Sequence, residues 1–184
     1  SDFENLTTSE LFLSLSQNIL DKNKIISNPY QLWSEINNKL PSIKIEVYGP
    51  SHTSGTREAF ENLILHSQCK KLQINLIPGS QNKCKIREGR HFIQIGENDN
   101  LIVQKLVTNK NALGIFGYNF LRQNTRLVKS VKIDGFDASY ENIVNNKYPL
   151  MRMLYLYYDE DASKKTLGFE EFIEELNDAI SIDG

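Results

Sequence analysis

Residues that could bind an anion lie close together in the segment 49–60, which reads GPSHTSGTREAF. Ser54 and Thr56 carry hydroxyl groups that can both donate and accept hydrogen bonds. Gly55 lets the backbone come close to a ligand. Arg57 adds a planar set of N–H donors whose geometry suits a tetrahedral oxyanion. These residue types together predict a site for such an anion.

This segment lies between a predicted strand and a predicted helix. Residues 43–48 alternate apolar and charged side chains, with β-branched and aromatic types among them, which is typical of a strand. In residues 59–64, apolar side chains recur at helical spacing. The first N–H groups of a helix have no intrahelical partner and carry the positive end of the helix dipole. The segment would therefore present an anion with open backbone donors.

A simpler interpretation needs no ligand. Ser54 or Thr53 would cap the helix, and Gly55 would complete the turn. Arg57, however, lies in the first helical turn, where a positive charge opposes the helix dipole unless an anion is nearby. This local conflict favours ligand binding.

The rest of the sequence alternates predicted strands and helices, which is typical of the α/β class. Thr7 and Glu10 have the spacing of a capping box at the start of a helix, and Trp33 recurs with Ile36 as a core residue would. Residues 150–158 form the longest strand candidate, and their apolar and aromatic content predicts burial on both faces. The other expected elements are helices at 8–18, 31–37, 99–109, 119–123, 140–145 and 169–180, strands at 92–95, 113–118 and 128–133, and a strand or loop at 72–85.

Composition excludes several classes of partner. The chain has 184 residues, a formal net charge of −2 and 24% charged residues, so it lacks the basic field expected of a nucleic-acid-binding protein. No apolar run is long enough to insert across a membrane. The three histidines and two cysteines do not have the spacing of metal ligands, so neither a metal nor a cofactor is expected.

Several motifs resemble one known family. The residues SGTR at 54–57, followed by an acidic residue and an apolar helix, resemble the phosphate-binding signature of the substrate-binding proteins of bacterial phosphate ABC transporters, which are type II periplasmic binding proteins. Further matches follow in the family's order: GENDN at 96–100, ALGIFGY at 112–118, IDG at 133–135 and YPLMR at 148–152. The resemblance covers nearly the whole chain.

The resemblance implies two α/β lobes joined by a strand hinge, with phosphate clamped between them. Residues 1–158 resemble the second lobe, a mixed β-sheet flanked by helices, together with the returning hinge strand. Residues 159–184 resemble a C-terminal segment whose helix would pack on the first lobe, which has no counterpart here. Because a clamp needs both walls, we expect this chain alone to bind phosphate weakly.

The resemblance also implies a function without catalysis, in which Ser54, Gly55, Thr56 and Arg57 bind inorganic phosphate for the permease subunits of a periplasmic ABC importer. The sequence itself contains no signal peptide, so export is implied only by the family. Some family members carry an aspartate, which accepts a hydrogen bond from protonated phosphate, where His52 stands here. His52, Thr53, Asn98 and Asp99 are weaker site candidates, the last two at a second helix start.

Three questions stay open at this point. If the protein is exported, Cys69 and Cys84 could form a disulfide that closes a short loop; otherwise they are two free thiols. The ligand could be another oxyanion, such as sulfate, molybdate or tungstate. An enzyme with Ser54 as nucleophile is a further alternative, although the loop lacks the lysine of a nucleotide-binding P-loop and no His–acid pair is recognisable near it.

Overall fold

A parallel sheet forms the centre of the computed structural model, which describes residues 3–77, 83–96, 98–153 and 155–182. The sheet has the order β5-β4-β6, with β4 at Val47–Gly49, β5 at Phe92–Gln94 and β6 at Leu113–Gly114. Tyr48 pairs with Ile93 on one side and with Gly114 on the other. The expected α/β class is confirmed, but the central sheet is purely parallel, whereas we predicted a mixed one.

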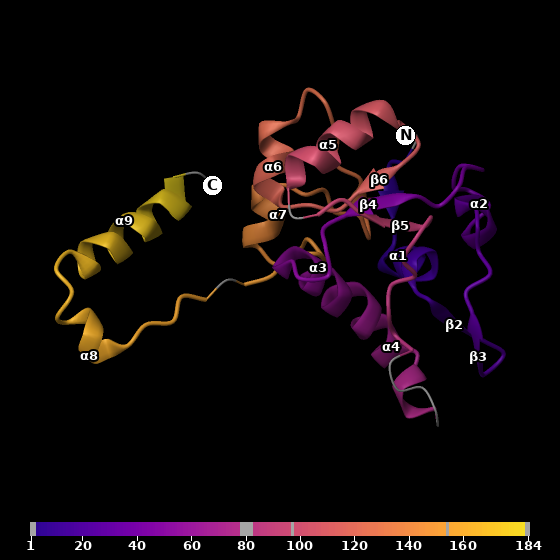
Figure 1. Cartoon of the computed structure of the whole chain (residues 1–184), viewed down its shortest axis with the longest axis horizontal. Helices are drawn as coiled ribbons and strands as arrows, with labels where there is room; N and C mark the ends of the chain where they lie inside the picture. The colour runs from indigo at the N-terminus through magenta and orange to yellow at the C-terminus, as the bar shows by residue number, and fades with distance from the viewer. Residues whose placement is uncertain (1–2, 78–82, 97, 154, 183–184) are drawn as a thin grey trace.

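Each strand of this sheet leads into a helix, as its sequence predicts. The helices are α3 at Gly55–Phe60, α5 at Asp99–Thr108 and α6 at Tyr118–Gln123. Helix α3 continues without interruption through a π-helical segment, Glu61–His66, into α4 at Ser67–Lys71. Figure 1 shows α3 and α4 as one rod that begins beside the sheet.

The first helix of the chain packs against this rod. The predicted capping box is present, because Thr7 accepts from the Glu10 N–H at the start of α1, Thr8–Leu15. Helix α1 contacts the π-helical segment and α4. Strand β1 at Asn5–Leu6 pairs in parallel with β7 at Lys132–Ile133. A strand was predicted at 128–133, and only its last two residues form one.

A hairpin that the sequence analysis did not predict follows α1. Strands β2 at Asn18–Asp21 and β3 at Lys24–Ser27 pair antiparallel. The two turn residues have positive φ, 44° at Lys22 and 66° at Asn23. This is the type I′ geometry that suits a two-residue hairpin loop, and asparagine tolerates it.

The described residues form a large hydrophobic core and a smaller one, which includes Ile102 of α5. Trp33, in the short helix α2 at Trp33–Ile36, is fully buried, as predicted, and Phe3 packs edge-on against it with ring centroids 5.0 Å apart. The Arg87 side chain is also buried, and this burial lowers its pKa to about 10. Its guanidinium donates to two backbone carbonyls, Ser14 at 2.8 Å and Tyr30 at 2.6 Å. The other large side chains that are fully buried are Phe12, Phe92, Leu6, Leu15, Ile45, Ile64, Leu65, Ile74, Ile102 and Val47.

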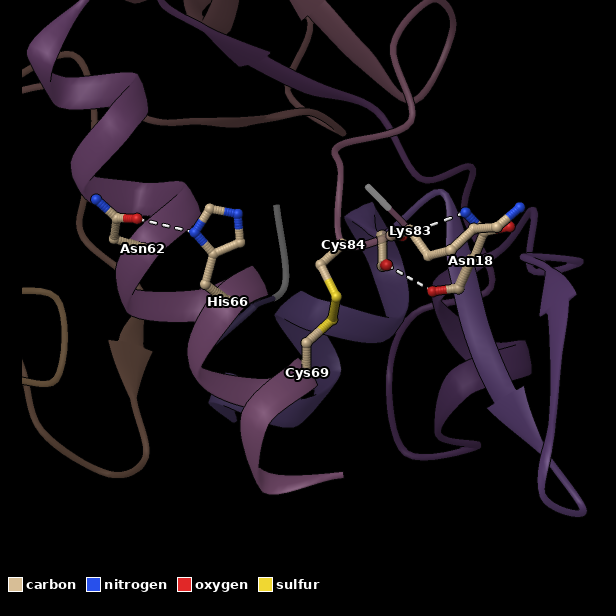
Figure 2. The surroundings of a disulfide bond; sticks show 7 residues. Asn18, Asn62, His66, Cys69, Lys83 and Cys84 are labelled. Carbon is tan, nitrogen blue, oxygen red and sulfur yellow. Dashed lines mark hydrogen bonds between the residues drawn. A yellow bond between two sulfur atoms is a disulfide. The ribbon is translucent and has the colours of Figure 1, made fainter. Parts of the chain in front are cut away.

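The expected disulfide is present and joins the rod to the chain that enters β5. Cys69, in α4, bonds to Cys84, fifteen residues later (Figure 2). Beside it, the Asn18 side chain donates to the Lys83 carbonyl at 3.2 Å (Figure 2). Within residues 72–85 the described part forms a short 3-10 helix, Ile74–Leu76, and no strand; residues 78–82 lie outside the described residues.

The prediction of a buried strand at 150–158 is wrong. Residues 150–153 and 155–158 form no strand, and Tyr157 is 87% exposed. A strand needs a neighbour for its N–H and C=O groups, and nothing in the described chain pairs with this segment. The apolar pattern of the segment therefore indicates that it could form a strand. In the described chain, however, no other strand pairs with it.

The C-terminal elements extend away from the sheet. After α7, Tyr140–Val144, the chain still packs against the core at Tyr148 and Leu150. Beyond Arg152 it leaves the core, and α8 at Glu160–Ser163 and α9 at Phe169–Ile182 lie apart from it (Figure 1). The helix predicted at 169–180 is confirmed. None of the helices in the described ranges is both long and apolar enough to cross a membrane.

Candidate functional site

Three helix starts meet at one edge of the sheet. Since β4, β5 and β6 are parallel, their carboxyl ends share this edge, and α3, α5 and α6 all begin there. Two hydrogen bonds hold the connecting loops together: the Ser51 N–H donates to the Gly96 backbone carbonyl at 3.1 Å, and the Gly117 N–H donates to the Asp99 side-chain carboxylate at 3.2 Å. The carboxyl edge of a parallel sheet is where α/β proteins commonly bind ligands.

The predicted loop forms the start of α3 as expected. Ser54 is the N-cap, and its side chain accepts from the Thr56 N–H at 3.2 Å. Within the described chain, no group accepts from the Gly55 N–H. Ser54 makes no hydrogen bond to a histidine or carboxylate there, so the nucleophile alternative gains no support. The loop thus keeps an open backbone donor and a hydroxyl proton at the helix start.

Arg57 points into the protein. Its side chain is only 4% exposed, and the guanidinium carbon lies 4.2 Å from the centroid of the Phe92 ring. A side chain at Gly49 would overlap with that ring, so the glycine leaves room for the stack. This cation–π contact fixes Arg57 against β5.

Two carboxylates already pair with Arg57. Its Nε donates to Glu61, one turn further along the helix, and its Nη2 donates to Glu88 at 3.0 Å. Glu88 also accepts from the Gln94 side-chain amide. The Arg57 Nη1 is buried and has no hydrogen-bond partner in the described part of the structure. One positive and two negative charges leave this cluster with a formal charge of −1.

A second arginine, which the sequence analysis did not assign to the site, reaches the loop from far along the chain. Arg152 Nη1 donates to the Gly55 carbonyl at 2.9 Å. Arg152 ends the YPLMR motif at 148–152, and that position in a recognised motif was the signal available in the sequence. Its contact with Gly55 depends on tertiary structure, because 97 residues separate the two.

A cavity of about 840 Å³ reaches Thr56 of the loop, whereas Ser54, Gly55 and Arg57 are not among the residues that line it. Thr56, Arg152, Asp99 and Tyr118 are among the residues that line it. Tyr148 is another lining residue, and burial raises its pKa to about 12, so its hydroxyl stays protonated and can donate. Most other lining residues are apolar.

The four weaker candidates lie in two places, the turn before α3 and the start of α5. His52 is exposed in the turn before α3, and the Thr53 hydroxyl lies 2.8 Å from that of Ser51. Asn98, one of the two residues expected at this helix start, is the N-cap of α5, and its side chain accepts from the Asn100 N–H at 3.0 Å. Of the four, Asp99 lines the cavity together with Thr56.

Comparison with known proteins identifies the family. The model of the PBP superfamily domain matches residues 2–178. The phosphate-binding protein PstS of Staphylococcus aureus is 30% identical over 162 residues, which cover 84% of this chain and 43% of that protein. This chain therefore spans less than half the length of the curated relatives that it matches.

Solved structures show the same fold. PstS from Borrelia burgdorferi superposes with a TM-score of 0.60 at 16% identity, over 94% of this chain and 58% of that one. An ABC-type phosphate transport receptor from Vibrio cholerae gives a TM-score of 0.57 at 17% identity, over 91% and 58% of the two chains. The chain thus belongs to the PBP superfamily and is homologous to the phosphate-binding protein PstS over most of its own length.

Proposed function

We propose that this chain binds inorganic phosphate, without catalysis, at the loop that begins α3. The observation that carries the proposal is the buried guanidinium of Arg57, which lies three residues after the Ser54 cap and whose Nη1 has no hydrogen-bond partner in the described residues. A buried donor without a partner costs free energy, so such donors in native proteins call for a ligand, water or ion. The homology to phosphate-binding PstS proteins supports phosphate as that ligand.

The ligand set follows from the donors at the start of α3. The Ser54 and Thr56 hydroxyls would donate to phosphate oxygens, the N–H groups of Gly55 and Thr56 would face the anion, and Arg57 would contribute Nη1. Thr56 lines the cavity at the carboxyl edge of the sheet, which gives the anion access to the loop. Each bond to a charged oxyanion is stronger than one to a neutral group.

We further propose that residues 1–158 act as the second lobe of a two-lobed receptor. The segment that follows Arg152 exposes several large side chains that a core would normally bury, among them Tyr155 and Tyr157. The curated relatives are more than twice as long as the part matched here, so a first lobe could cover this segment and the helix in residues 159–184. The chain alone would then bind phosphate weakly, because one wall of the clamp is missing.

The proposed cellular role is that of the extracytoplasmic receptor of an ABC phosphate importer, with the permease subunits as protein partners. The disulfide between Cys69 and Cys84 supports an oxidising compartment such as the periplasm, because such bonds are rare in the cytosol.

The test separates the capping role of Ser54 from its role toward the anion. Glycine and aspartate both remain acceptable N-caps, so Ser54→Gly and Ser54→Asp should change the free energy of unfolding by only a few tenths of a kcal/mol. Both remove the hydroxyl donor, and aspartate adds a charge that repels an anion. We expect phosphate titration to shift the Gly55 and Thr56 amide signals of the native chain, to do so several-fold more weakly in Ser54→Gly, and to leave Ser54→Asp unaffected.

Sulfate, molybdate and tungstate are titrated in parallel at constant ionic strength. Amide shifts that occur with one of these anions and not with phosphate would assign the loop to that oxyanion. If no anion shifts these two amides, or if Ser54→Asp responds like the native chain, the loop is an ordinary helix cap.

A further inference from the structure

We propose that Arg152 is a second anion-binding arginine of this site and supplies the positive charge that Arg57 cannot. The inference rests on the proposed function above, because it assigns a further residue to the same anion. It concerns a residue that the loop motif at 54–57 does not include, and it rests on contacts of the folded chain.

The position of Arg152 brings its charge directly to the loop. Its Nη1 lies 2.9 Å from the Gly55 carbonyl oxygen. A Cβ atom placed on Gly55 would lie 3.5 Å from Nη1 and 3.6 Å from Nη2, so the guanidinium extends over the residue that opens α3. Arg152 and Thr56 line the same cavity, which places the arginine on the accessible side of the loop.

The charges around the two arginines differ. Arg57 pairs with Glu61 and Glu88, so its cluster carries a formal charge of −1 and would repel an approaching anion at longer range. Arg152 forms no ion pair in the described residues. Its positive charge is therefore available to a ligand, whereas that of Arg57 is already compensated.

The place of Arg152 in the fold is unfavourable without an anion. It lies against the first residue of α3, where the unpaired N–H groups give the helix a partial positive charge. A cation is stabilised at the opposite end of a helix, so the contact with Gly55 brings two positive features together. An oxyanion that contacts both the loop and Arg152 removes this conflict. It also links the loop to the segment 148–152, from which the chain continues toward α8 and α9.

The geometry also distinguishes arginine from lysine at this position. With Nη1 on the Gly55 carbonyl, the planar guanidinium keeps further N–H groups for the anion, and the side chain is exposed enough to turn toward it. A lysine would keep the charge but lose the two-pronged geometry. We therefore expect the order of phosphate affinity to be native chain, then Arg152→Lys, then Arg152→Gln.

The experiment measures phosphate affinity of the whole chain from the amide shifts of Gly55 and Thr56, for the native protein and the two Arg152 variants. Loss of a charge-assisted hydrogen bond should weaken binding about ten-fold or more in Arg152→Gln. Arg122→Gln is the matched control, because Arg122 is an exposed arginine of α6 that does not line the cavity. It changes the net charge by the same amount, and we expect it to bind like the native chain.

Each outcome decides between the two proposals. If Arg152→Gln binds phosphate like the native chain while Ser54→Asp does not, the role of Arg152 is refuted and the anion site remains. If Arg152→Gln and Arg122→Gln weaken binding equally, the effect is one of net charge and the proposal for Arg152 also fails. If the native chain shows no response to phosphate, the proposed function and this inference fall together. Thermal unfolding of Arg152→Gln close to that of the native chain shows that the fold is intact.

Discussion

Replacing Arg57 by methionine tests how much of its role is structural. Methionine keeps an apolar stem against Phe92 but removes the cation–π contact, which contributes about 1 kcal/mol. The two carboxylate contacts add about 2 kcal/mol together, a figure below that of a fully buried pair because Glu61 is 27% and Glu88 46% exposed. We therefore expect Arg57→Met to lower the free energy of unfolding by about 3 kcal/mol.

Urea unfolding followed by circular dichroism measures this change. With a slope of about 2 kcal/mol per molar urea, the midpoint should fall by roughly 1.5 M. Glu88→Gln is the control, because it removes one partly exposed partner and should cost no more than about 1 kcal/mol. The double variant Arg57→Met/Glu88→Gln isolates the coupling between the two charges.

An unfolding free energy of Arg57→Met within about 0.5 kcal/mol of the native value would refute the reasoning. It would mean that the contacts of Arg57 with β5 and the preceding loop do not hold α3 in place. Zero coupling in the double variant would refute the pairing with Glu88 specifically.

Three further predictions concern stability. Cys69 and Cys84 close a fifteen-residue separation, so Cys69→Ser/Cys84→Ser should lower the free energy of unfolding by about 3 kcal/mol, measured by urea melts and matched by the reduced native chain. Burial lowers the pKa of His91, so its contribution to the free energy of unfolding should be complete above about pH 6.5 and should decrease as the pH falls below that value. His91→Gln should remove this pH dependence, and an unchanged pH profile of the variant would contradict the prediction. Arg87→Met leaves the buried Ser14 carbonyl and the part-buried Tyr30 carbonyl without this donor and should cost about 2 kcal/mol by thermal or urea unfolding, whereas a loss below about 0.5 kcal/mol would show that water replaces the side chain.

The local features of the site could be predicted from the sequence. Thr7 forms a capping box with Glu10, as predicted, and Ser54 and Asn98 cap α3 and α5, each being one of the two cap residues expected at its helix. These contacts join residues only two or three positions apart, so adjacent residue types decide them. The same holds for the helical periodicity of α5 and α9, and much less for the strands, which proved shorter than expected.

Only the tertiary structure decided which groups far apart in the sequence meet at the site. Arg57 pairs with Glu88, which lies 31 residues away, and Arg152 reaches Gly55 across 97 residues. No local pattern encodes such contacts, because they depend on which loops the sheet order brings to one edge. The segment 150–158 is a second case in which the local sequence was not enough to predict the structure. Its residues have the composition of a buried strand, but a strand forms only where another chain segment supplies the hydrogen bonds and the apolar surface to pair with it.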